Sequence, residues 1–141
     1  MPQSRAERGI GRAVGHRRWA IAEGYIPPRS TGRGRALESH ETLCILNAGD
    51  REARVKITVY FAAREPAGPY RFVVPARRTR HLRFNDFRKP EAVPKGKDFA
   101  SLVESTVPVV VQHTRLDSRQ PALALLSTIA FPIGEASKRG R

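Results

Sequence analysis

Apolar and polar residues alternate along much of this chain, most clearly over residues 53–62. Four apolar side chains occupy every second position there: Val55, Ile57, Val59 and Phe61. A period of two residues predicts a β-strand with one face toward the core and the other toward solvent. Residues 47–50, Asn-Ala-Gly-Asp, come just before and are typical of a hairpin turn.

Shorter patterns of the same kind predict further strands. They lie at residues 19–26, 41–47, 70–74, 77–84, 107–116 and 123–131. Residues 86–98 contain two prolines and a glycine and predict a long irregular loop, and Asp98 is a candidate N-cap for one helical turn over residues 98–103. Seven or eight short strands without a long helical pattern predict an all-β protein, an antiparallel β-sandwich of jelly-roll type.

The two ends of the chain are basic and lack this periodicity. We expect a disordered basic arm at residues 1–18 and a flexible basic tail at residues 132–141, which leaves residues 19–131 as one folded domain. No apolar stretch is long enough to span a bilayer, and no signal-peptide pattern follows the N-terminus, so we expect a cytoplasmic protein. Cys44 is expected to be a buried small side chain rather than a reactive thiol.

Lysine and arginine outnumber the acidic residues 26 to 13, which gives a formal net charge of +13. Such an excess favours anionic partners: nucleic acid, a membrane surface or an acidic protein face. Aromatic residues are few, so contacts to the phosphate backbone are better supported than stacking on bases. The candidate residues for nucleic-acid binding are Arg5, Arg8, Arg12, Arg17, Arg18, Arg33 and Arg35.

A first polar cluster lies in the strand predicted at residues 77–84. Alternation would place four of its side chains on one face: Arg77, Thr79, His81 and Arg83. Arginines on a strand face can bind phosphate or carboxylate groups of a partner or ligand. The alternative is a solvated edge strand, whose charges prevent edge-to-edge aggregation.

A second polar cluster follows the apolar residues 107–111. His113 and Arg115 would share a strand face, and Asp117 could form an ion pair with Arg115 or Arg119. Polar clusters at strand ends often line binding sites, because loops gather there. The alternative is a structural ion-pair network or a contact between subunits. A small ligand could bind if this cluster and the one at residues 77–83 converged in a pocket.

The sequence carries no recognisable pattern for catalysis or metal binding. Ser118 or Ser127 could be combined with His113 and Asp117 for hydrolysis, but no G-x-S-x-G motif is present. His40 with Glu41, His81 and His113 could be combined into a metal site, but no pair has the tight spacing of metal ligands. We therefore expect a protein that is not an enzyme and has no cofactor and no metal.

Several runs of unusual composition together resemble the family of soluble sensory rhodopsin transducers, first described with the cyanobacterial sensory rhodopsin. The resemblance extends over nearly all of residues 19–131. Its runs are residues 19–28 (WAIAEGYIPP), 39–42 (SHET), 44–50 (CILNAGD), 68–71 (GPYR), 74–79 (VPARRT), 83–86 (RFND), 98–101 (DFAS), 109–120 (VVVQHTRLDSRQ) and 125–130 (LLSTIA).

The resemblance implies a jelly-roll β-sandwich that assembles as a homotetramer. It also implies a non-enzymatic signalling adaptor that docks on a seven-helix photoreceptor or another signalling protein. DNA binding and the binding of a small, carbohydrate-like ligand are alternatives that the family suggests. It supplies no catalytic residues. The Arg-rich arm, the Gly/Arg stretch near residues 31–35 and the basic tail extend beyond the family pattern.

Overall fold

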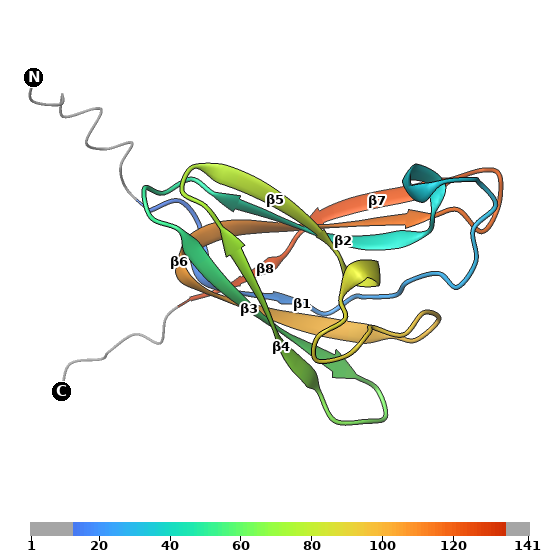
Figure 1. The fold of residues 1–141 in the computed structure, drawn as a ribbon, viewed down its shortest axis with the longest axis horizontal. Helices are drawn as coiled ribbons and strands as arrows, with labels where there is room; N and C mark the ends of the chain where they lie inside the picture. The colour runs from blue at the N-terminus through green and yellow to red at the C-terminus, as the bar shows by residue number, and fades with distance from the viewer. Residues whose placement is uncertain (1–12, 135–141) are drawn as a thin grey trace, which may run out of the picture.

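The structure is a computed structural model that describes residues 13–134, within which the chain forms eight β-strands and two 3-10 turns (Figure 1). The strands are β1 (His16–Ile21), β2 (His40–Asn47), β3 (Ala53–Phe61), β4 (Ala67–Val74), β5 (Arg78–Arg83), β6 (Phe99–Asp117), β7 (Ala124–Ile129) and β8 (Phe131–Ile133). The turns are η1 (Arg35–Leu37) and η2 (Phe84–Asp86). The predicted all-β class is confirmed, and so is the strand count.

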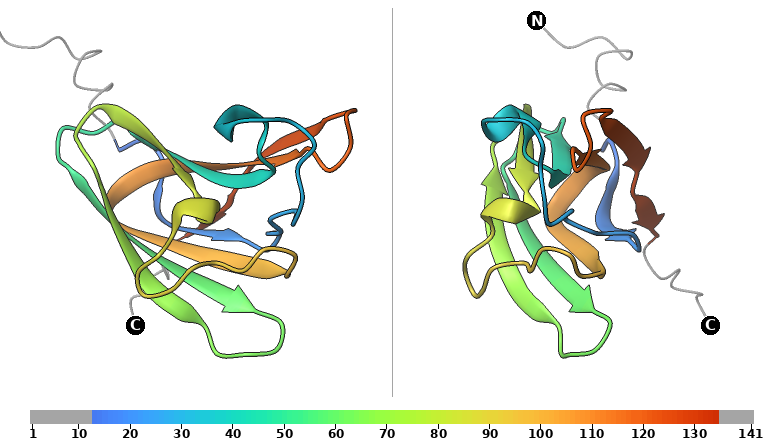
Figure 2. Two further views of the ribbon diagram at one scale, coloured as in Figure 1. Left: turned by 45° about the vertical axis from the view of Figure 1, so that its right-hand side comes forward. Right: turned by 90° about the vertical axis from the view of Figure 1, so that its right-hand side faces the viewer.

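The strands of the described range pair antiparallel in two sheets that share β6. Sheet 1 has the order β4-β3-β6-β1-β8, and sheet 2 has the order β5-β2-β6-β7. Residues 99–105 of β6 pair with β3, whereas residues 110–116 pair with β2. Figure 2 shows β6 curving from one sheet into the other. The core lies between the inner faces of the two sheets, so the predicted antiparallel β-sandwich is confirmed.

The prediction of a helical turn over residues 98–103 is wrong, because residues 99–103 belong to β6 and Asp98 directly precedes it. Phe99, Ser101 and Val103 point inward at every second position, and the segment pairs with β3 on one side and β1 on the other. Two neighbouring strands therefore override the capping signal of Asp98. Pro108, which has no N–H to donate, lies between the segments that pair with β3 and with β2.

Inward-facing apolar side chains fill the space between the sheets. Val55, Ile57 and Val59 are buried as their alternation predicts, while Phe61 at the end of β3 is half-buried. Trp19 is also buried, and its indole N–H donates to the carbonyls of Val109, at 2.9 Å, and His16, at 3.0 Å. A buried polar group with two acceptors adds rigidity to the junction between β1 and β6.

The folded part of the chain extends beyond the expected residues 19–131 at both ends. β1 begins at His16, and β8 continues to Ile133 beside it. Residues 16–18 are exposed, so their strand has no apolar alternation for a sequence pattern to detect. Residues 1–12 and 135–141, which hold most of the expected arm and tail, lie outside the described residues. Within residues 13–134, no helix is long and apolar enough to cross a membrane.

Candidate functional site

A buried carboxylate, Glu41, lies at the centre of the most polar region of the sandwich interior. It occupies the inner face of β2 and is completely shielded from solvent. Its Oε1 accepts hydrogen bonds from the backbone N–H of Tyr25, at 2.8 Å, and from Nε of Arg115, at 2.6 Å. Its Oε2 contacts Nε2 of His113, which is equally buried on β6. The carboxylate thus joins the segment before β2 to the second half of β6.

Arg115 extends this network from the interior to the surface. Its Nη2 lies 2.5 Å from Oε1 of the exposed Glu23, and its guanidinium lies over the ring of Tyr25. Burial of Arg115 disfavours its charge, but the hydrogen bonds to Glu23 and Glu41 outweigh that cost and raise the pKa of the guanidinium above its ordinary value. Arg115 therefore stays charged and holds both carboxylates in place.

The charge-assisted hydrogen bonds around Glu41 offset the cost of burying its carboxylate. An ionised carboxylate only accepts hydrogen bonds, so Nε2 of His113 carries the proton that is directed at Glu41. Nδ1 of His113 is buried without a hydrogen-bond partner among the described residues. Glu41, Arg115 and His113 thus form a buried polar network that connects β2 to β6.

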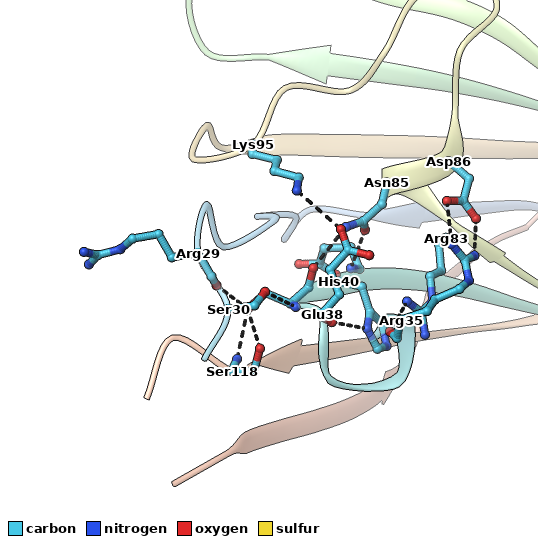
Figure 3. Close-up of polar contacts among 12 residues, drawn as sticks. Arg29, Ser30, Arg35, Glu38, His40, Arg83, Asn85, Asp86, Lys95 and Ser118 are labelled. Carbon is cyan, nitrogen blue, oxygen red and sulfur yellow. Dashed lines mark hydrogen bonds and ion pairs between the residues drawn. The ribbon is translucent and has the colours of Figure 1, made fainter. Parts of the chain in front are cut away.

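A second network ties residues 29–39 to the end of β6 (Figure 3). The hydroxyl of Ser39 donates to the carbonyl of Arg29 at 2.7 Å and accepts from the backbone N–H of Ser118 at 3.0 Å. The hydroxyl of Ser118 donates to the carbonyl of Leu37 at 2.5 Å. Ser39 and Ser118 are both buried, so these bonds fix the long loop between β1 and β2 over the end of sheet 2.

Asn85 and Arg35 attach the same loop to η2. Asn85 donates to the carbonyl of Ser39 at 3.0 Å and accepts from the backbone N–H of Glu41. Arg35 forms a bidentate ion pair with Asp86, and Arg83 donates to the carbonyl of Arg35 (Figure 3). The hydrogen bond from Arg35 is the main reason that the pKa of Asp86 lies below its usual range. Four segments of the sequence therefore meet around Ser39 and Glu41.

The two polar clusters predicted from the sequence lie on opposite faces of sheet 2. His81 is directly opposite Cys44, which is opposite Gln112, so these residues share the outer face. Leu82, Leu43 and His113 are the next residues along and share the inner face. The clusters at residues 77–83 and 113–119 therefore do not converge in a common pocket, and the small-ligand site that required their convergence is not formed.

Within the first cluster, Thr79, His81 and Arg83 follow one face of β5, while Leu82 and Phe84 are buried. Arg77 lies before the strand, in a turn with a positive φ of 54°. In the second cluster, Asp117 pairs with Arg119, whose guanidinium is 5.6 Å from the centre of the Tyr25 ring. The hydrogen bond from Arg119 lowers the pKa of Asp117.

The serines considered for hydrolysis are engaged elsewhere. Ser118 bonds to Ser39 and to the Leu37 carbonyl, and Ser127 accepts from Thr114. Across residues 13–134, neither hydroxyl has a hydrogen bond to a histidine. Cys44 is half-buried on the outer face of sheet 2 rather than in the core, and burial raises the pKa of its thiol, which disfavours the reactive thiolate.

The candidate nucleic-acid-binding residues are dispersed. Arg17 and Arg18 lie on β1, Arg33 is exposed in the loop after it, and Arg35 is paired with Asp86. Arg5, Arg8 and Arg12 lie outside the described residues. The described members of this set therefore do not form one continuous surface along a single element.

The polar clusters predicted from the sequence leave out three participants in the network around Arg115: Glu23, Tyr25 and Glu41. One signal was available for Glu41. In the strand predicted at residues 41–47, Leu43 and Ile45 mark the inner face, and the same period places Glu41 on it. A charged residue at a core position must find partners, so it identifies a polar network before those partners are known.

Comparisons with known proteins agree with this fold. The family model for the Anabaena sensory rhodopsin transducer matches residues 14–132. A solved structure named Anabaena sensory rhodopsin transducer is 54% identical, covers 72% of this chain and 97% of its own, and has a TM-score of 0.62. The crystal structure of Thermotoga maritima 1070 is 35% identical, covers 84% of this chain and 96% of its own, and has a TM-score of 0.76.

The comparison with curated proteins gave no match. The family model nevertheless spans all the strands of the described range up to β8, including the network around Glu41. The chain belongs to the family of the Anabaena sensory rhodopsin transducer.

Proposed function

We propose that this protein is a non-enzymatic signalling adaptor of the cytoplasm that binds a seven-helix photoreceptor or a related signalling protein. The observation that carries this proposal is the family match over residues 14–132, together with 54% identity to a protein named as a sensory rhodopsin transducer. The site geometry supports it, because the titratable side chains of the interior bond to one another. A protein with this arrangement acts through its surface.

Co-purification with a receptor tests this function. Tagged full-length protein, incubated with detergent-solubilised membranes of its own organism at low salt, is expected to retain a seven-helix membrane protein that mass spectrometry identifies. The control is the tag alone on the same membranes. Absence of any such protein from the retained fraction, with the adaptor folded by circular dichroism, would contradict the proposal.

We further propose that the chain assembles as a homotetramer through β7. All six residues of β7 are exposed, with Leu125 at 70% and Ile129 at 58% of full exposure. Among the described strands, β7 pairs with β6 alone, which leaves its other edge unpaired. An apolar strand with a free edge favours association with another copy of the same chain.

The variant Leu125→Glu with Ile129→Glu should therefore dissociate the assembly. Light scattering after size-exclusion chromatography is expected to give four times the 15.7 kDa chain mass for the wild type and a smaller mass for the variant. The matched control, Tyr60→Glu with Val73→Glu, changes two exposed apolar residues of sheet 1 and should leave the mass unchanged. A monomeric wild type would overturn the proposal.

DNA binding is the second candidate function, and the net charge of +13 is the observation that favours it. Binding through phosphate contacts would weaken steeply as the salt concentration rises. Titration of duplex DNA with the full chain at low and at high salt tests this candidate, and binding that is absent or insensitive to salt would contradict it.

A further inference from the structure

The outer face of sheet 1 carries an unusual concentration of positive charge. Arg54 and Lys56 project outward from β3, and Arg71 projects outward from β4. Lys56 and Arg71 are directly opposite each other in the strand register. Like charges at such a position repel and destabilise the strand pair, so their presence calls for another role.

A carboxylate on the neighbouring strand offsets part of this charge. Lys56 lies opposite Glu104 on its other side, yet among the described residues neither Lys56 nor Arg71 has a hydrogen-bond or ion-pair partner. Glu52 pairs with Arg54 at 3.1 Å, but both side chains are mostly exposed. Two unpaired cations therefore face solvent from neighbouring strands.

These cations line an open groove of about 780 Å³ between β3, β4 and β5. Arg80 of β5 forms its third side, with the guanidinium 5.4 Å from the centre of the Phe72 ring and a hydrogen bond of 2.9 Å to the Val73 carbonyl. Phe72 and Val73 also line the groove. It combines fixed positive charge with an apolar floor.

Exposed apolar side chains share this face with the cations. Val73, directly opposite Arg54, is 41% exposed, and Tyr60, further along β3, is 43% exposed. Aromatic and aliphatic groups interspersed with lysine and arginine are typical of proteins that rest on the interface of an anionic bilayer. Such groups gain free energy in the interface, whereas the hydrated phosphate backbone of duplex DNA offers them no apolar environment.

We propose that the outer face of β3 and β4, defined by Arg54, Lys56, Arg71, Val73 and Tyr60, binds the anionic lipid headgroups of a membrane. The proposal rests on the proposed function in that an adaptor of a membrane receptor works beside a bilayer. Binding by this face would orient sheet 1 toward the lipid. Sheet 2 would then face away from the membrane, and its strand β7 would remain available for contact with other copies of the chain.

Vesicle co-sedimentation of the full chain tests this surface without any receptor. Vesicles of phosphatidylcholine with phosphatidylglycerol are expected to bind the protein at low salt, and vesicles of phosphatidylcholine alone are not. Each lysine or arginine beside an anionic surface strengthens binding about fivefold, so Lys56→Ala with Arg71→Ala should weaken binding about 25-fold. Removing two opposed like charges should not destabilise the fold, which circular dichroism checks.

The matched control is Arg33→Ala with Lys97→Ala, which removes the same charge from exposed loop positions and should weaken binding far less. An equal loss in both variants would mean that net charge alone is responsible and would overturn the assignment of this face. Failure of the wild type to bind anionic vesicles would overturn it too. So would duplex DNA binding that the Lys56/Arg71 variant loses while vesicle binding is unchanged.

These outcomes are separable from a failure of the proposed function, because receptor retention is measured in detergent without a bilayer. If the protein retains the receptor but does not bind anionic vesicles, only the proposed membrane-binding surface is refuted. One that binds vesicles through Lys56 and Arg71 but retains no receptor refutes only the adaptor function.

Discussion

Replacing Glu41 with alanine is expected to lower the free energy of unfolding by about 3–5 kcal/mol, because the change removes a buried carboxylate from its ion pair with Arg115, whose remaining counter-charge among the described residues is the exposed Glu23. Arg115 Nε and the Tyr25 N–H would lose their acceptor, and His113 would lose the partner of its Nε2. The loss is a large fraction of the stability of a typical domain. Urea unfolding monitored by the fluorescence of Trp19 measures it.

Two further variants make this prediction discriminating. Glu52→Ala removes a carboxylate whose ion pair with Arg54 is exposed, so we expect a loss of at most about 1 kcal/mol. Glu41→Gln keeps the shape of the side chain and one acceptor oxygen, so its loss should lie between the two. It remains informative if the alanine variant does not fold. Equal stability of the wild type and Glu41→Ala would show that the network contributes nothing to folding.

The sequence predicted the strands better than it predicted the side-chain contacts between them. Residues 53–62 were identified from their period of two, because one face of β3 is buried and the other is mostly exposed. His113 and Arg115 were placed on one strand face, and in the structure both contact Glu41. Their partner could not be deduced, because the register that brings β2 beside β6 is set by contacts 72 and 74 residues apart in the chain.

The segment after β5 illustrates a different limit. Residues 86–98 contain prolines and lack a period, so the sequence predicted a loop, and the structure shows a loop. Yet Phe87 and Val93 within it are buried in the core. An irregular backbone has no repeating direction, so no spacing of residues reveals which of its side chains point inward.

β6 shows how tertiary pairing decides an ambiguous segment. A capping signal, Asp98, comes just before its nineteen residues, which contain a proline and an apolar run, and these features separately predicted a helical turn and a short strand. Pairing with strands of both sheets joins these parts into one element, and the proline is accommodated where the pairing partner changes. One continuous strand thus connects the two sheets, although the local sequence patterns predicted two separate elements there.

Replacing Phe87 with alanine is expected to lower the free energy of unfolding by about 3–5 kcal/mol, the usual cost of deleting a buried aromatic ring. The Phe87 ring contacts those of Tyr70, Phe72 and Phe84, with centres 4.9, 5.1 and 4.8 Å away. Phe87 comes directly after η2, which follows β5, and its ring covers the core at that end of the sandwich. The surrounding rings cannot move in to fill the space, because strands or η2 hold each of them, so a cavity remains.

The matched control is Tyr60→Ala, which truncates an aromatic residue that is 43% exposed, so the change should cost less than about 1 kcal/mol. Urea unfolding of both variants, with the slope against denaturant compared to that of the wild type, separates a loss of stability from a change in the unfolded state. A small loss for Phe87→Ala would mean that the loop at residues 86–98 detaches from the core at little cost.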